Sequence, residues 1–211
     1  MGLTIVDSFS SMKRKIDTAI ANHMNKLIQR KKDRAEKQIK SLIRGWIEQQ
    51  PEVISLRDQG GFGSLNAQFG LPPGVPDIAI EGIIEALVAS VNVNFKKVNS
   101  RFSSGGIEFS IKGDVILQIL NIPQGIIVTE KGRPLNWLEW LLTRGNAAVI
   151  SGYQYVAGPS GRSGGGVMIG GSSFRVEPTS YAGTVDNNFV TRAFSGRDRQ
   201  LSRVLRGVLK G

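Results

Sequence analysis

The sequence of 211 residues has no cysteine and only one histidine, His23. Without a thiol the chain has no disulfide, no thiolate metal ligand and no cysteine nucleophile. One histidine is too few for a histidine-rich metal site, and it supplies a Ser-His-Asp triad poorly. The carboxylates of the second half are not spaced with a base or a metal-ligand partner. We therefore expect no catalytic, cofactor-binding or metal-binding residue, and a protein that is not an enzyme.

Long apolar runs are also missing. No window approaches the roughly 20 apolar residues of a membrane-spanning helix. The beginning, MGLTIVDSFSSMKRK, lacks the order of basic end, apolar run and small-residue cleavage site that a signal peptide has. We therefore expect no membrane partner and synthesis in the cytoplasm. Hydrophobic residues still make up 40% of the chain, which is enough for a packed core, and the 26 glycines indicate many turns.

The net charge of +10 is unevenly distributed. Met12 to Arg44 carries 11 basic and three acidic residues, and Arg197 to Gly211 carries five basic and one acidic, so that the middle is neutral to slightly acidic. The basic ends suit nucleic-acid phosphates, a membrane surface or acidic surfaces of other proteins. Aromatic residues are not interleaved with the charges, which disfavours base stacking. The apolar face of the tail is short and lacks aromatics, which disfavours membrane binding.

Apolar residues recur every three or four positions from Ser11 to Gln50, which predicts one long helix that Pro51 ends. At ~1.5 Å per residue it would be roughly 50–60 Å long, more than a small domain covers. The stripe also lapses at QRKKDR, residues 29–34, so we expect the helix to project or bend there. Residues 1–50 are predicted to be a basic intersubunit arm whose removal leaves a folded core. An ordinary long helix with a solvated basic face is the alternative.

Two sets of contact residues follow from this arm and from the C-terminal segment 197–211, which is predicted to be a basic amphipathic helix. Apolar residues of the two helices are predicted to contact other subunits: Ile16, Ile20, Met24, Leu27, Ile39, Trp46, Leu201 and Leu205. Basic side chains are predicted to face an acidic partner or DNA: Lys31, Lys32, Arg34 and, in a later loop, Arg162.

Residues 51–76 are rich in glycine and proline, but they also contain large apolar side chains that a merely flexible linker does not need. We expect an irregular segment docked on its neighbours. A buried helix is predicted over Ile78–Val91, which is apolar nearly all round. Apolar and polar residues then alternate from Val91 to Val98, which predicts a strand.

The segment Pro134–Gly145, PLNWLEWLLTRG, predicts a short buried helix at the centre of an α+β core domain, residues 77–196. Trp137, Trp140 and Leu141 are predicted core residues. Pro134 suits the first helical turn, and Gly145 suits a left-handed residue just past its end. Glu139 is expected on the exposed side, paired with Arg144 or Lys131. Short apolar runs around this segment favour strands: Ile107–Ile111, Val115–Leu120, Ile126–Val128, Ala147–Val156, Val167–Ile169 and Phe174–Glu177. The predicted fold class is therefore α+β, a small curled, mostly antiparallel sheet packed on short helices, with a long basic helix before it and an amphipathic helix after it.

The glycine-rich stretch Gly158–Gly171 is predicted to begin as a mobile loop around Arg162 and to end in a short strand. A phosphate-handling enzyme built on the loop Gly161–Gly166 is disfavoured, because the loop has no Lys-Ser/Thr ending and no helix follows it directly. We expect a surface loop that becomes ordered on contact with a partner.

Four stretches of the second half carry a resemblance to a known class: EKGRPLNWLEWLLTRG (130–145), GRSGGGVMI (161–169), FRVEP (174–178) and AGTVDNNFVTRAF (182–194). From Thr129 onward, over about the last 40% of the chain, the sequence resembles a type of virion structural protein found in tailed bacteriophages. The resemblance implies a neck, tail-completion or tail-terminator protein, a small α+β subunit that assembles into a ring between head and tail. It implies no active site.

The expected function is therefore that of a non-enzymatic structural subunit of a tailed-phage virion, in a ring at the neck, the head–tail junction or the tail terminus. Expected partners are copies of itself, a portal or adaptor protein, a tail tube or sheath protein, and DNA passing through the ring. A basic nucleic-acid-binding protein and a phage baseplate component are the alternatives.

Overall fold

The structure is a computed structural model that describes residues 8–129, 132–145 and 147–210. It is 52% helical and 18% strand, with a long N-terminal helix and a C-terminal helix, so the predicted α+β class is confirmed. Among the described residues the strands form three separate two-stranded antiparallel sheets. The pairing is antiparallel as predicted, but it is divided among three ribbons.

The chain forms two compact units. The first unit comprises residues 1–40, 91–112 and 197–211, and the second comprises residues 41–90 and 113–196. Helix α1 (Phe9–Glu48) contributes its first part to one unit and its last part to the other. The division between the units therefore falls inside the helix that was expected to be a separate arm of residues 1–50.

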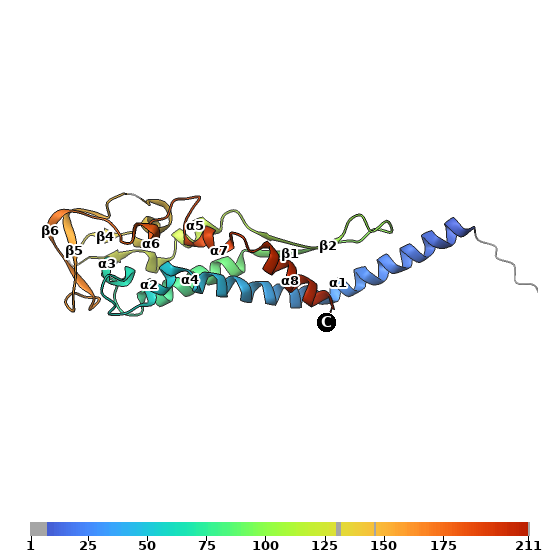
Figure 1. Ribbon diagram of the computed structural model, residues 1–211, viewed down its shortest axis with the longest axis horizontal. Coiled ribbons are helices and arrows are strands. Elements are labelled where there is room, and N and C mark those ends of the chain that lie inside the picture. The colour runs from blue at the N-terminus through green and yellow to red at the C-terminus, as the bar shows by residue number, and fades with distance from the viewer. Residues whose placement is uncertain (1–7, 130–131, 146, 211) are drawn as a thin grey trace, which may run out of the picture. The chain divides into compact units, whose positions relative to one another are not determined.

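The first unit consists of α1 up to Lys40, a hairpin and α8 (Asp198–Lys210). The hairpin pairs β1 (Val91–Lys96), where the alternating pattern predicted a strand, with β2 (Gly106–Ile111) (Figure 1). Ala21 and Ile28 of α1 pack with Val98, and Phe95 and Ile107 of the hairpin cover this small core.

The side chain of Asn25 also joins α1 to the hairpin. Its Nδ2 donates to the carbonyl of Val98 at 3.1 Å, and its Oδ1 accepts from the Val98 N–H at 2.8 Å. The amide thus satisfies both backbone groups of the residue just beyond the end of β1. Such pairing matters because a partly buried peptide group without a partner is costly.

The second unit begins with the end of α1 and three further helices, α2 (Pro51–Arg57), α3 (Leu65–Phe69) and α4 (Val75–Ala89). Residues 51–76 were expected to be irregular, but they contain α2 and α3; Leu65, Phe69 and Leu71 of this segment are buried. The buried side chain of Gln68 exchanges hydrogen bonds with the backbone of Glu177, which fixes α3 to the segment after the last strand.

The prediction of a strand over Val115–Leu120 is wrong, because these residues form helix α5. A run of six residues that is almost entirely apolar has no period by which helix and strand can be told apart. The run is followed by a 3-10 turn, η1 (Pro123–Gly125), and by the short ribbon of β3 (Ile127–Val128) with β4 (Pro134–Leu135).

The tryptophan helix α6 spans Trp137–Thr143, three residues later than its predicted start. Pro134 lies in β4 rather than in the first helical turn. Gly145 is not left-handed; instead its N–H donates to the carbonyl of Gly183 at 2.6 Å, and a Cβ at Gly145 would lie 2.9 Å from that oxygen. A glycine is therefore required here, because the backbone of Gly183 comes too close to leave room for a side chain.

The last part of the second unit is the hairpin of β5 (Ile150–Ala157) with β6 (Gly166–Phe174) (Figure 1). A 3-10 turn, η2 (Thr179–Tyr181), and helix α7 (Phe189–Phe194) follow. The predicted strand over Phe174–Glu177 is reduced to Phe174, the last residue of β6.

The core of the second unit lies around α6. Trp137, Trp140 and Leu141 are 0%, 5% and 0% exposed. The Trp137 Nε1–H donates to the carbonyl of Gln124 at 2.8 Å, so the buried indole has its partner. The ring centroid of Phe69 lies 6.0 Å from that of Trp137 and 6.0 Å from that of Trp140.

The end of α1 belongs to this core as well. Ile43 and Ile47 are fully buried, and Trp46 packs edge-on against Phe194 of α7 with the ring centroids 5.8 Å apart. Removing residues 1–50 would take these side chains out of the core, so the expectation that the remainder folds intact is corrected. Within the described residues, no helix is both long and apolar enough to span a bilayer.

Candidate assembly surfaces

One face of α1 carries an exposed row of apolar residues. Phe9, Ile16, Ile20, Met24 and Leu27 are 81%, 59%, 46%, 38% and 40% exposed. At about 100° per residue they fall within about 80° of arc, and the same arc holds Lys13, Lys31 and Arg34. We call these eight residues the α1 stripe. It is an apolar row with a cation near its start and two at its end.

A second apolar face of α1 lies beside the stripe and is buried by the chain itself. It is formed by Ala21, Ile28, Ala35, Ile39, Ile43, Trp46 and Ile47. The predicted contacts Ile39 and Trp46 therefore need correction, because at 0% and 3% exposure they are core residues. The sequence pattern merged two faces into one, since both have the helical period. The apolar period lapses at residues 29–34, but α1 continues unbroken through them.

The two units differ in charge. The residues of the first unit include 19 basic and six acidic ones, a net +13, whereas those of the second include eight basic and 11 acidic ones, a net −3. The β1–β2 hairpin segment adds to the first unit with Lys96, Lys97, Arg101 and Lys112. Folding thus collects the basic ends and this hairpin into one body.

Helices α2 and α4 form an acidic face on the second unit. Arg57 on α2 contacts Asp77 at 3.3 Å and Glu81 at 3.2 Å on α4, and Arg44 binds Glu81 at 2.8 Å. The hydrogen bond that Arg44 donates to Glu81 raises the pKa of Arg44 above its usual value despite the opposing effect of burial. These ion pairs bring the two helices together.

Exposed apolar side chains also occur on these two helices and in the loop after α2. Ile54 is 60% exposed and lies one helical turn before Arg57, while Ile78 is 56% exposed and lies one turn before Glu81. Phe62, in the loop after α2, is 62% exposed. Asp58 and Glu85 are exposed, and within the described parts of the chain neither has an ion-pair partner. We call Ile54, Asp58, Phe62, Asp77, Ile78, Glu81 and Glu85 the α2–α4 face.

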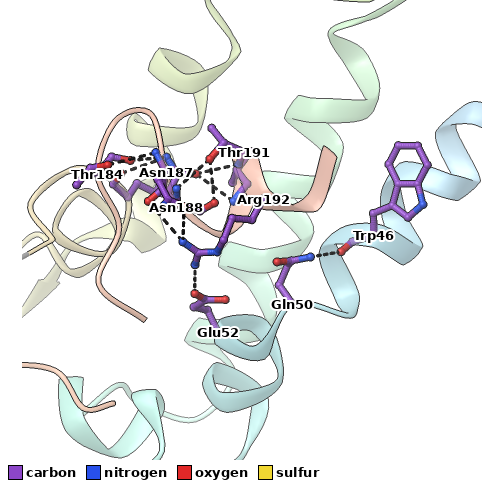
Figure 2. Close-up of polar contacts among 10 residues, drawn as sticks. Trp46, Gln50, Glu52, Thr184, Asn187, Asn188, Thr191 and Arg192 are labelled. Atoms are coloured by element: carbon purple, nitrogen blue, oxygen red, sulfur yellow. Dashed lines mark hydrogen bonds and ion pairs between the residues drawn. The ribbon is translucent and has the colours of Figure 1, made fainter. Parts of the chain in front are cut away.

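A buried ion pair joins the start of α2 to α7. Figure 2 shows Arg192 extending from α7 to Glu52, and Arg192 Nη2 binds Glu52 Oε1. Glu52 is 2% exposed, and its second oxygen, Oε2, is buried without a hydrogen-bond partner. Burial raises the pKa of Glu52, while its own backbone N–H and Arg192 act in the opposite direction.

Asn188 holds the other end of this network (Figure 2). Its Oδ1 caps α7 by accepting from the N–H of Val190 at 3.0 Å and of Thr191 at 3.1 Å. Its Nδ2 donates to the carbonyl of Leu142, the second-last residue of α6, at 3.2 Å. The side chain is fully buried, so one residue caps one helix and fixes the end of another.

The Glu52–Arg192 pair borders a surface hollow lined also by Pro51, Asn187 and residues 179–182. Asn187, in the loop before α7, already accepts at Oδ1 from Arg192 Nη1 at 3.0 Å. We interpret the network as structural. Asn188 and Glu52 were not singled out from the sequence, although the Asn-Asn pair before an apolar run did indicate the helix start.

The glycine-rich loop between β5 and β6 is held by its own chain. Arg162 Nε donates to the carbonyl of Gly70 at 2.9 Å, and its Nη1 donates to the carbonyl of Val128 at 3.3 Å. The Tyr155 hydroxyl donates to the carbonyl of Gly165 at 2.7 Å and accepts from the N–H of Gly63 at 3.1 Å. The expectation of a loop ordered only by a partner is therefore corrected.

The structure also places the predicted contact residues of α8 and α1, and Glu139 of α6. On α8, Leu201 and Leu205 are half-buried, Val208 is buried, and the basic residues Arg199, Arg203 and Arg206 are exposed, which is the amphipathic pattern expected. On α1, Lys32 is half-buried and Arg34 is exposed. Glu139 pairs with Arg144 at 3.1 Å, as predicted, whereas Lys131 lies outside the described residues.

In the described part of the chain, no three His, Cys, Asp or Glu side chains are grouped as metal ligands would be. No protein-family model, no curated protein and no solved structure matches the chain. The features that bear on function are therefore the α1 stripe, the α2–α4 face and the sequence resemblance.

Proposed function

We propose that this chain is a non-enzymatic structural subunit that assembles with copies of itself into a ring in a tailed-phage virion, at the neck, the head–tail junction or the tail terminus. The observation that carries the proposal is the α1 stripe, on which five large apolar side chains lie exposed on one helix face. A contiguous apolar row rimmed by charge is characteristic of a protein–protein contact. The assignment to a virion comes from the resemblance of residues 130–194.

The partners proposed are copies of the chain and adjoining virion proteins, such as a portal or adaptor and a tail tube or sheath. Contacts that repeat head to tail form rings when the rotation between copies closes. The basic first unit is suited to line a path for DNA, because its charge of +13 attracts phosphates without reading base sequence. A baseplate component remains the alternative station within the particle.

The glycine-rich loop supports a packing role rather than phosphate chemistry. A Cβ at Gly161 would collide with the carbonyl of Gly166, and one at Gly166 would collide with the Tyr155 ring. These glycines permit close approach within the hairpin, and Arg162 is directed to carbonyls of the same unit.

Sedimentation of the purified chain tests self-assembly. We expect the wild type to form an oligomer and the variant Ile16→Asp/Ile20→Asp to sediment as a monomer, because two charges on the stripe would have to be buried in the contact. Leu117→Asp is the matched control, since Leu117 is 64% exposed on α5, outside the stripe. Equal sedimentation of wild type and stripe variant would exclude the stripe as the contact.

A nucleic-acid-binding protein is the second candidate, and the charge of the first unit favours it. In that case the monomer would bind duplex DNA tightly, and the logarithm of the affinity would fall steeply with the logarithm of the salt concentration. Fluorescence anisotropy with a labelled duplex at several salt concentrations measures this. Tight binding by a monomer that never oligomerises would favour this candidate over the ring subunit.

A further inference from the structure

We propose that the α1 stripe of one copy docks on the α2–α4 face of a second copy, so that copies join head to tail. This inference rests on the proposed function, because it names the partner of the surface from which that function is argued. Each stripe binds the face of one neighbouring copy, and each face binds the stripe of another.

Charge complementarity favours this pairing over contact between two stripes. The stripe carries Lys13, Lys31 and Arg34, so two stripes brought together would confront like charges. Residues 41–90 hold six acidic and two basic residues, and no basic residue occurs from Asp58 to Phe95. The face is thus the acidic region of an otherwise basic chain. Opposite charges around a contact raise the association rate and fix its register, whereas like charges oppose it.

The two surfaces also match in the kind of side chain that they expose and in the length of the helices that carry them. The stripe presents Phe9, Ile16, Ile20, Met24 and Leu27, and the face presents Ile54, Phe62 and Ile78, all exposed. From Phe9 to Leu27 the stripe is ~27 Å long, and α4 with its 15 residues is ~22 Å long, at ~1.5 Å per residue. A helix laid along another helix buries such rows against each other.

The carboxylates of the face divide into two groups. Asp77 and Glu81 are already paired with Arg57 and Arg44, so neither carboxylate needs a cation from the stripe. Asp58 and Glu85 are exposed and remain to meet the cations at the ends of the stripe. The face therefore offers apolar side chains beside paired charges, together with exposed carboxylates for the cations of the stripe.

Because the stripe and the face are different surfaces, the contact is heterologous, and every copy keeps one of each available for the next copy. Such a contact propagates from copy to copy, and it gives a ring when the rotation between copies closes. A contact between two identical stripes would stop at a dimer. The two possibilities therefore predict different behaviour when defective copies are mixed.

The experiment mixes two defective variants of the full chain. Ile16→Asp/Ile20→Asp destroys the stripe and keeps the face, and Ile78→Lys/Glu85→Lys destroys the face and keeps the stripe. Each is expected to be a monomer by light scattering after size exclusion. An equimolar mixture is expected to form a particle of two chains and no larger one, since only one intact stripe and one intact face meet. Leu117→Asp, altered outside both surfaces, is expected to assemble as the wild type does.

The outcomes separate the two proposals. A face variant that assembles as the wild type does would overturn this inference and leave the proposed ring subunit standing, with the stripe bound elsewhere. Two monomeric variants that give no two-chain particle when mixed would overturn it as well, provided that circular dichroism shows both to be folded. A wild type that stays monomeric at all concentrations would overturn the proposed function together with this inference.

Discussion

At the scale of single residues, three buried polar side chains join segments of the second unit that are distant in the sequence. Glu52, Gln68 and Asn188 are each almost fully buried, and each bonds to a segment far away in the sequence. In a sequence such residues look like ordinary surface residues, because their partners are set only by the fold. Apolar periodicity therefore indicated where the core lies but not which polar groups hold its parts together.

The Glu52–Arg192 pair predicts a stability that depends on pH. Because burial raises the pKa of Glu52 above its unfolded value, the folded state binds the proton more tightly. The carboxyl therefore contributes most to stability below the ordinary glutamate pKa, and this contribution is lost as pH rises through the folded-state pKa. Replacing Glu52 by Gln should remove this slope from the unfolding free energy.

Replacing Arg192, the cation of this pair, should lower the free energy of unfolding mainly at neutral pH. We expect Arg192→Met to cost about 2–3 kcal/mol at pH 7, below the full effect for a completely buried pair because Arg192 is partly exposed. The loss should shrink toward pH 4.5, the ordinary pKa of a glutamate, because the raised pKa of Glu52 keeps it mostly protonated there. Urea unfolding followed by tryptophan fluorescence measures both values, with Glu52→Gln/Arg192→Met as the control that lacks the pH dependence. An equal loss at both pH values would contradict the assignment.

Replacing Asn188 should lower the free energy of unfolding by more than the loss of an ordinary helix cap does. Asn188→Ala should cost about 2–3 kcal/mol, because it removes the cap of α7 and leaves the buried carbonyl of Leu142 without its donor. The neighbouring Asn187→Ala should cost under about 1 kcal/mol, since Asn187 is exposed. Thermal unfolding of the two variants gives the comparison, and similar melting temperatures would show that Asn188 does not link α6 to α7.

At the scale of elements, long periodic segments were predictable and short apolar runs were not. The pattern located α1, α4 and α8, as well as the strand pairs at Val91 and at Ile150, within a few residues. It failed at Val115–Leu120, where six residues give no period, and at Pro134, where the chain makes a short ribbon before the helix begins. On α1 it could not separate an exposed apolar face from the buried face next to it, because both repeat with the same period.

The tryptophan helix α6 predicts the largest losses of stability in the chain. Trp137→Ala should cost about 3–5 kcal/mol, because a fully buried indole leaves a large cavity and the Gln124 carbonyl loses its donor. Trp140→Ala should be comparably harmful. Leu117→Ala, at an exposed position on α5, is the control and should cost under about 1 kcal/mol. Chemical denaturation measures all three, and near-wild-type stability of both tryptophan variants would mean that α6 is not the centre of the core.

At the scale of the whole chain, the two units carry opposite charge, and each has an exposed apolar surface. The first unit has a net charge of +13 and the α1 stripe, and the second has a net charge of −3 and the α2–α4 face. The sequence showed basic ends and a near-neutral middle. It did not show that the hairpin of residues 91–112 belongs with the ends, because that depends on packing of Val98 against Ala21 and Ile28.

This distribution of charge predicts that assembly weakens with salt. Opposite charges at the rim of a contact are screened over about 10 Å at 0.1 M salt and over about 3 Å at 1 M. We therefore expect the dissociation constant of the assembly to rise between these concentrations. Sedimentation equilibrium at the two concentrations measures the change, and assembly that is unaffected or strengthened by salt would indicate a contact dominated by apolar burial.

The central claim is that copies of this chain close into a ring through the exposed part of α1. Electron microscopy of the purified wild type tests it most directly, beside a deletion of residues 1–20, which removes Phe9, Ile16 and Ile20 but stops short of the buried Ala21. The account predicts closed rings of one size for the wild type and folded single particles for the deletion. Wild-type chains that remain single, or deleted chains that still form the same rings, would contradict it.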